Sequence, residues 1–216
     1  MNPDFAIILN FKLADPNNID PDQLVRTARN IGIRAINAND LFKTASEKYT
    51  IKLIDTSDGQ DLTADNVIDT IVSNRKNNQA TIINVNVNED GQIDEASAKL
   101  LDAINNWMHM FGHALNEGTK SDLTVDDETA FVLENRHAAY QKYVFIKEQI
   151  PAQIIVSGLS QEPNRVEWIE HRETLEFNFK DNELKIKLSK PIEEFEWNVL
   201  RIQAHRPEDD IAETKF

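Results

Sequence analysis

The sequence predicts an α/β domain with a parallel sheet, followed by an all-β domain built as an antiparallel β-sandwich. In the first half, compact apolar runs alternate with amphipathic helical segments, a pattern typical of parallel strands joined by helices. After about residue 118, apolar residues recur at every second position in short runs bounded by turn residues. We therefore expect two domains, residues 1–118 and residues 119–216, with the acidic segment 119–129 as a linker.

Four strand-and-helix units are expected in the first half. The expected strands are 5–11, 33–38, 49–55 and 81–87. The first helix follows Asp20, a suitable cap, has Pro21 at its first position and ends at Gly32. Weaker helical character covers 41–48, and a clearer helix follows Thr63. Asp94 caps a long last helix that we expect to break at Gly112.

Six short strands are expected in the second half, and together they predict a sandwich. They are 143–146, 152–156, 165–169, 175–179, 184–188 and 199–202. Asp181 and Asn182 separate two of them and tolerate the positive φ angles of a tight hairpin turn. Four aromatic residues lie in alternating strands, which predicts core packing, with a sugar-stacking platform as the alternative: Trp168, Phe177, Phe179 and Trp197.

Composition excludes several classes of function. The chain has 23 Lys and Arg against 37 Asp and Glu, a net charge of -14, so nucleic acid is not an expected partner. There is no cysteine, and no apolar stretch is long enough to cross a membrane. His109 and His113 lie four residues apart, but no acidic residue lies between them as in a metalloprotease helix. We expect a soluble cytoplasmic protein with no metal and no cofactor.

One set of residues resembles a known family. In the segment 80–119 the matching residues are Asn84, Asp90, Gly91, Ile104, Trp107, Gly112, Ala114, Gly118 and Thr119. This segment resembles the last strand and helix of the barrel of family 29 glycoside hydrolases, the α-L-fucosidases. Residues 143–202 look like the C-terminal sandwich of that family, and residues 19–42 are similar to an early helix and the motif after it.

The resemblance implies a shortened barrel. The middle of the family's barrel is missing between about residues 42 and 63, which leaves a half TIM-like (β/α)4 unit. A closed eightfold barrel takes about 200 residues or more, and only about 115 precede the sandwich here. The retained strands correspond to both ends of the barrel, which are neighbours in the closed ring, so we expect one continuous four-stranded parallel sheet.

The resemblance also predicts that the catalytic residues are absent. Residues 37–42 stand where the family has Lys-His-His-Asp-Gly-Phe, and Ala38 and Asn39 replace its two histidines. None of the three tryptophans is followed two places on by the aspartate of the family's nucleophile motif. Retaining glycosidases need two carboxyl groups about 5 Å apart. Because the aspartate that would be one of them has no counterpart here, we expect no catalytic residue in this chain.

Five residues are candidates to face a ligand at the carboxyl ends of the predicted parallel strands. They are Asn37, Asn39, Asp40, Asp55 and Asn84. Parallel α/β proteins gather binding groups at this end of the sheet. The alternative is that these residues cap turns or face solvent, as Asn and Asp commonly do.

Three functions follow as hypotheses. The first is a non-catalytic, α-L-fucosidase-like protein that binds a carbohydrate, such as a fucose-like sugar, or another protein. The second is an active α-L-fucosidase that completes its site through oligomerisation, and the third is a structural or assembly subunit. Because a half-barrel sheet has two open edges and an apolar face, we also expect a homodimer or another protein partner.

Overall fold

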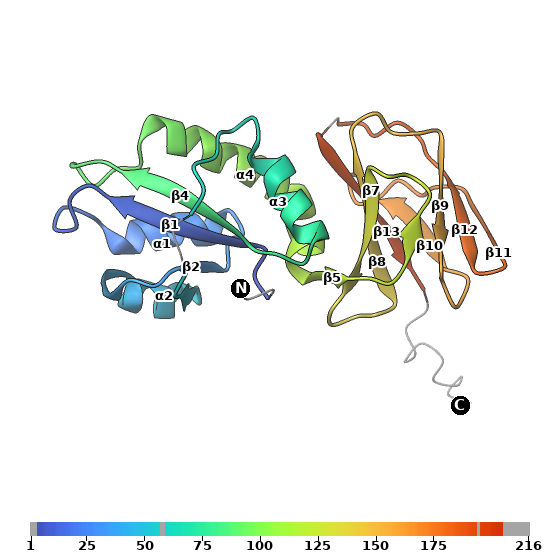
Figure 1. The fold of residues 1–216 in the computed structure, drawn as a ribbon, viewed down its shortest axis with the longest axis horizontal. Coiled ribbons are helices and arrows are strands. Elements are labelled where there is room, and N and C mark those ends of the chain that lie inside the picture. The colour runs from blue at the N-terminus through green and yellow to red at the C-terminus, as the bar shows by residue number, and fades with distance from the viewer. Residues whose placement is uncertain (1–3, 57–58, 194, 205–216) are drawn as a thin grey trace, which may run out of the picture. The chain divides into compact units, whose positions relative to one another are not determined.

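The computed structural model describes residues 4–56, 59–193 and 195–204 (Figure 1). The chain divides into two compact units, Met1–Asn116 and Glu117–Phe216. None of the helices in these described ranges is long and apolar enough to cross a lipid bilayer.

The first unit is built on a four-stranded parallel sheet in the order β3-β2-β1-β4. Its strands are β1 (Ile7–Leu13), β2 (Ala35–Asn37), β3 (Lys52–Ile54) and β4 (Thr81–Val87). The first strand lies beside the last, as a continuous piece of a barrel requires, so the predicted half-barrel sheet is confirmed. The register places Asn10 opposite Asn84, and Leu9 opposite Ile36.

Helices follow each strand. They are α1 (Pro21–Asn30), the 3-10 turn η1 (Asp40–Phe42), α2 (Lys43–Tyr49), α3 (Val67–Lys76) and α4 (Glu95–Glu117). The Asp20 side chain accepts a hydrogen bond from the Gln23 amide at 3.1 Å, as its predicted role as a cap requires. Gly32 has a φ of +84°, which suits the end of α1.

The predicted break at Gly112 is wrong, because α4 continues to Glu117. Gly112 is buried within the helix, and a β-carbon there would lie 3.1 Å from the Met108 Cε atom. The glycine therefore makes room for the Met108 side chain and does not end the helix.

The two faces of the parallel sheet carry alternate residues of each strand. On one face the ring of Phe11 lies 5.5 Å from that of Phe42 in η1, and Asn74 of α3 donates to the Thr81 hydroxyl at 3.0 Å. The opposite face, here called the inner face, has an apolar cluster at the amino end of the strands. Its buried members are Ile8, Ala35, Ala80 and Ile82, with Phe5 and Ile54 packed against them.

The second unit is a sandwich of two antiparallel sheets, in the orders β10-β13-β8-β7-β5 and β11-β12-β9-β6. Its strands are β5 (Gly118–Lys120), β6 (Thr124–Val125), β7 (Ala130–Asn135), β8 (Gln141–Lys147), β9 (Gln153–Ser157), β10 (Arg165–Trp168), β11 (Phe177–Lys180), β12 (Glu183–Lys187) and β13 (Trp197–Gln203). Trp168 is buried in its core, and Phe179 packs against that core. The predicted hairpin is confirmed, with φ of 52° at Asp181 and 64° at Asn182.

Two expectations about this unit are wrong or incomplete. The segment 119–129 is not a linker, because β6 lies within it and most of β5 does too, and both strands pair with others in the sandwich. The sequence analysis also missed β7, whose run Phe131-Val132-Leu133 is buried throughout and so shows no alternation. The fold class is nevertheless as predicted, a parallel α/β unit followed by an antiparallel sandwich.

Candidate functional site

Three asparagines form a row across the inner face of the parallel sheet, one from each of three adjacent strands. Asn37 of β2 donates through Nδ2 to Asn10 Oδ1 at 3.0 Å. Asn10 of β1 then donates through Nδ2 to Asn84 Oδ1 of β4 at 2.9 Å. The parallel register sets this spacing, because it aligns Asn10 directly with Asn84. We call these three residues the asparagine row.

A second segment of the same chain bonds to both ends of this row. Its described residues, 55–56 and 59–62, are here called the strap; in Figure 1 it belongs to the teal chain that leads to α3. At one end of the row, the amide and hydroxyl of Thr56 both donate to Asn37 Oδ1, at 3.2 and 3.0 Å. At the other end, Asn84 Nδ2 donates to Gly59 O at 2.9 Å and to Asp61 Oδ1 at 2.8 Å.

The strap also pairs with the edge of the sheet through its backbone. The Gln60 amide donates to Ile82 O at 2.8 Å, and the Asn84 amide donates to Gln60 O at 3.0 Å. This is a parallel bridge beside β4. It covers part of one open edge of the sheet, which would otherwise expose unpaired backbone groups.

Gly59 is required for the close approach of the strap. A β-carbon at this position would lie 2.5 Å from Asn84 Oδ1 and 3.0 Å from the Asn84 backbone nitrogen. The first contact is closer than β-carbons approach other atoms, the second is unusually tight, and neither atom belongs to the free end of a long side chain. Only a residue without a side chain fits between the strap and the row.

The three side-chain amides are joined by hydrogen bonds from one to the next. Asn84 uses both hydrogens of its amide group on the strap, and Asn37 Oδ1 accepts two bonds from Thr56. Of the residues joined by these bonds, only Asp61 carries a carboxyl group, and its side chain is exposed. Among the residues that the structure describes, these bonds hold the strap in place and bring no two carboxyl groups together.

The structure brings together two of the five predicted site residues. Asn37 and Asn84 belong to the asparagine row, whereas Asp40 and Asp55 are exposed and take no part in its bonds. Asn39 is also exposed, and its Oδ1 accepts from the Leu41 amide at 3.0 Å, so it caps η1.

Sequence reasoning missed Asn10, the central member of the row. Asn10 is buried, with 6% of its surface exposed. The available signal was a single amide inside the otherwise apolar run 5–11, since a buried polar group needs a hydrogen-bonding partner. The identity of that partner depends on strand register, which the sequence does not state.

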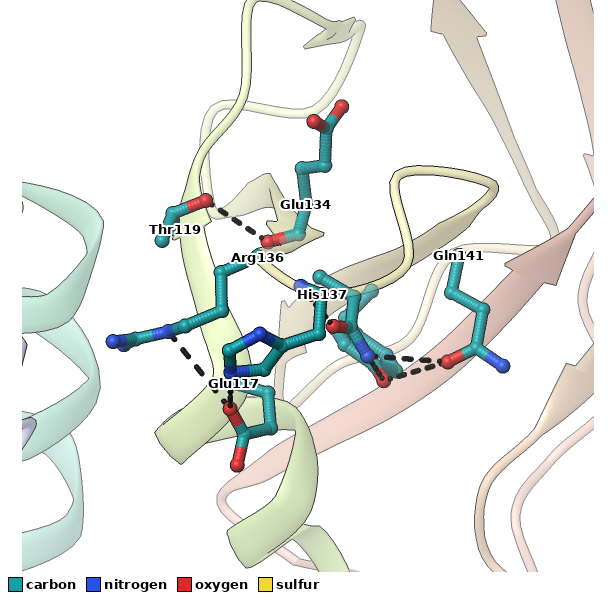
Figure 2. A network of polar contacts seen from close by, with 8 residues as sticks. Glu117, Thr119, Glu134, Arg136, His137 and Gln141 are labelled. Atoms are coloured by element: carbon teal, nitrogen blue, oxygen red, sulfur yellow. Dashed lines mark hydrogen bonds and ion pairs between the residues drawn. The ribbon is translucent and has the colours of Figure 1, made fainter.

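A second polar cluster lies in the sandwich unit, where β5 follows α4 (Figure 2). The Glu117 carboxylate lies 3.3 Å from His137 Nε2 and 3.8 Å from Arg136 Nε. Nearby, Asn135 donates to the Tyr143 hydroxyl at 2.9 Å, and burial raises the pKa of Tyr143 above its usual value. These contacts join the turn after β7 to the last residue of α4, and they serve the fold of this unit.

The described residues contain one group that could hold a metal ion, Glu170, His171 and Glu193, whose ligand atoms lie within 4.8 Å of one another. One Glu170 oxygen already accepts from the Glu193 amide at 2.6 Å, so the group also serves as a clamp between two loops. His109 and His113 are exposed on α4 and are not part of such a group within the described ranges.

Comparison with known proteins identifies the fold. No family model matches the sequence, and no curated protein does either. Among solved structures, α-L-fucosidase isoenzyme 1 from Paenibacillus thiaminolyticus has a TM-score of 0.55 and 13% identity, over 92% of this chain and 58% of that one. The family 29 α-L-fucosidase from Bacteroides thetaiotaomicron has a TM-score of 0.55 and 13% identity, over 89% of this chain and 42% of that one.

A third structure, Thermotoga maritima α-fucosidase in complex with fucose, has a TM-score of 0.52 and 18% identity, over 65% of this chain and 34% of that one. At these identities the likeness is one of fold. This chain spans between 34% and 58% of the length of the three proteins. The resemblance to family 29 α-L-fucosidases seen in the sequence is confirmed at that level, over part of their length.

Proposed function

We propose that this chain, with its partial α-L-fucosidase fold, binds a carbohydrate or a protein partner and does not hydrolyse glycosides. The observation that carries the proposal is the strap bonded across the asparagine row. Its described residues bond to Asn37, the last residue of β2, and to Asn84 in the middle of β4, and parallel α/β proteins ordinarily bind ligands at the carboxyl ends of such strands. The strap bonds to both ends of the row. Thr56 donates to Asn37 Oδ1 at one end, and Asn84 Nδ2 donates to Gly59 O and Asp61 Oδ1 at the other.

The chemistry of glycoside hydrolysis supports the same proposal. A retaining glycosidase needs two carboxyl groups about 5–5.5 Å apart, one to attack the sugar and one to protonate the leaving group. Among the described residues, the asparagine row and its bonded partners supply one, Asp61, which already accepts from Asn84. Asp40 and Asp55 are exposed and lie outside the row's bonds.

Hydrolysis of an aryl α-L-fucoside tests the proposal. We expect the purified full chain to release no phenol above the rate in buffer. A rate above buffer that is lost in both Asp40→Ala and Asp61→Ala, but kept in Glu128→Ala on an exposed turn of the sandwich, would establish an enzyme instead. Measuring the rate at several protein concentrations distinguishes a site within one chain from a site completed by oligomerisation, because the activity per chain of the second would fall on dilution.

Binding is tested by thermal unfolding with a panel of monosaccharides that includes L-fucose. A ligand that binds only the folded chain stabilises it, and the unfolding temperature then rises with the logarithm of the ligand concentration above its dissociation constant. A shift with one or more sugars supports the carbohydrate-binding form of the proposal. No shift with any sugar and no protein partner would favour a purely structural subunit.

A homodimer stays a prediction. The apolar cluster on the inner face is already buried in the single chain, with Ile8 at 1% and Ala35 at 0% exposure. A second copy would therefore bind through the free edge at β3 or through another surface. Light scattering at micromolar concentration gives the mass directly, and the mass of one chain would refute the dimer.

A further inference from the structure

We propose that a groove at one end of the sandwich binds a neutral, hydroxyl-rich ring such as a pyranose; this rests on the carbohydrate-binding function proposed above and assigns its site. The groove lies between the connection from β8 to β9, the chain after β12 and the start of β13. Its volume is about 860 Å³, within the range of small-molecule sites. Its lining includes Ile150, Pro151, Ser189, Phe195 and Asn198.

The floor of the groove holds an unsatisfied acceptor. Asn198 of β13 is 3% exposed and lies opposite Ile146, on the same side of its strand as the core residue Leu200. Its Nδ2 donates to Phe195 O at 2.8 Å, which fixes the orientation of the amide. Within the described part of the chain, Asn198 Oδ1 has no hydrogen-bond partner.

A buried oxygen without a donor costs folding free energy, and native proteins rarely leave one unpaired. A hydroxyl group of a ligand in the groove would supply the missing donor. Asn198 lines the groove but its Oδ1 is shielded from solvent, so a ligand hydroxyl reaches this oxygen only if the Asn198 side chain turns and gives up its present bond to Phe195 O. An acceptor at the floor selects ligands that carry O–H or N–H groups.

The walls of the groove suit the apolar face of a sugar ring. Phe195, Ile150 and Pro151 are each partly exposed along it. Ile192, in the same loop as Phe195, is 70% exposed, which is unusual for a large apolar side chain. A pyranose has C–H groups on one face and hydroxyls at its edge, so it can contact these side chains and the amide together.

The charges around the groove disfavour anionic ligands. Among the described residues two carboxylates, Glu148 and Glu196, and one lysine, Lys190, line it; Lys147 Nζ lies 3.8 Å from Glu196, and the chain as a whole has a net charge of -14. Phosphates and carboxylates would be repelled, whereas carboxylate oxygens accept hydrogen bonds from sugar hydroxyls. Ser189 is held in place because the Trp168 indole donates to its hydroxyl at 3.2 Å.

The test is an NMR titration of the full chain with methyl α-L-fucopyranoside, methyl α-D-glucopyranoside and, separately, inorganic phosphate. We expect at least one of the two glycosides to shift amide signals of the non-proline residues in 148–152, 188–193 and 195–198. We expect Asn198→Leu to weaken that binding about tenfold, the effect of losing one hydrogen bond. Asn178→Leu, an exposed matched change on β11, should leave it unchanged.

The outcomes separate this inference from the proposed function. Glycoside binding with shifts elsewhere, or binding equal in Asn198→Leu and Asn178→Leu, would overturn the groove assignment and leave the carbohydrate-binding function standing. If the unaltered chain binds neither glycoside at glycoside concentrations of tens of millimolar, both the groove assignment and the carbohydrate-binding function are refuted for these two sugars. Phosphate binding in the groove would overturn the neutral class of ligand. The titration of the unaltered chain decides the location even if Asn198→Leu fails to fold.

Discussion

The substitution Gly59→Ala probes the contact that holds the strap on the asparagine row. The added methyl group would lie 2.5 Å from Asn84 Oδ1, so the strap must move away from β4. That movement weakens the two bonds from Asn84 Nδ2, to Gly59 O at 2.9 Å and to Asp61 at 2.8 Å. At about 1 kcal/mol for each bond and up to about 1 kcal/mol of residual overpacking, we expect a loss of about 2–3 kcal/mol.

Amide hydrogen exchange measures this loss locally, which matters because a chain with two units need not unfold in one step. The reporters are the amides of Gln60 and Asn84, which form the bridge between strap and strand. A loss of about 2–3 kcal/mol predicts exchange about 30- to 150-fold faster at both. The amides that join β8 to β13 in the sandwich are the internal control and should not change.

A double-mutant cycle identifies the cause. In an Asn84→Ala background the close oxygen is gone, so adding Gly59→Ala should cost less than it does in the unaltered chain. A small cost should persist, because the Asn84 backbone nitrogen would still lie 3.0 Å from the methyl group. An equal cost in both backgrounds, or unchanged exchange at Gln60 in Gly59→Ala alone, would refute this account of the strap.

Two further substitutions test local features of the fold. Asp94→Ala should cost about 1 kcal/mol at pH 7, because Asp94 accepts from the Ser97 amide and caps α4. That backbone hydrogen bond lowers the pKa of Asp94 below its ordinary 3.8, so the stabilisation is complete above that pH and is lost as pH falls through the lower folded value. Urea unfolding should therefore show a difference between Asp94→Ala and the unaltered chain that shrinks toward pH 2, and a constant difference would contradict it. Asn182→Val should destabilise the sandwich by about 1–3 kcal/mol in thermal unfolding, because a β-branched residue is strained at a φ of 64°. Asn182→Gly should not destabilise it, because glycine accepts this φ without strain. Equal effects of the two substitutions would contradict the turn assignment.

Local patterns in the sequence predicted most of the fold. The apolar runs and caps placed the four parallel strands and the start of α4, because burial on one or both faces of an element leaves its period in the sequence. The hairpin at Asp181 and Asn182 was equally local, since it depends only on which residues accept a positive φ. Where two interpretations of one residue compete, as at Gly112, the local signal was insufficient. A helix-breaking residue and a residue that admits Met108 look the same in sequence.

The asparagine row shows the limit of the same reasoning. Asn37 and Asn84 were predicted to lie at strand ends, but 27 residues separate Asn37 from Asn10, and 74 separate Asn10 from Asn84. Strand order and register alone bring the three amides together, and both depend on packing across the whole unit.

The sequence by itself determined the order of strands and helices in the first unit, the change from a parallel to an antiparallel unit and the acidic charge. Each of these is written in residues close together along the chain. Only the tertiary structure decided that the strap bonds to Asn37 and Asn84, that Asn10 links these two asparagines, and that Asn198 Oδ1 lacks a partner within the described residues. The physical reason is that the path of the backbone decides which distant polar groups meet and form hydrogen bonds. The residue type alone indicates only that a buried polar group needs a partner.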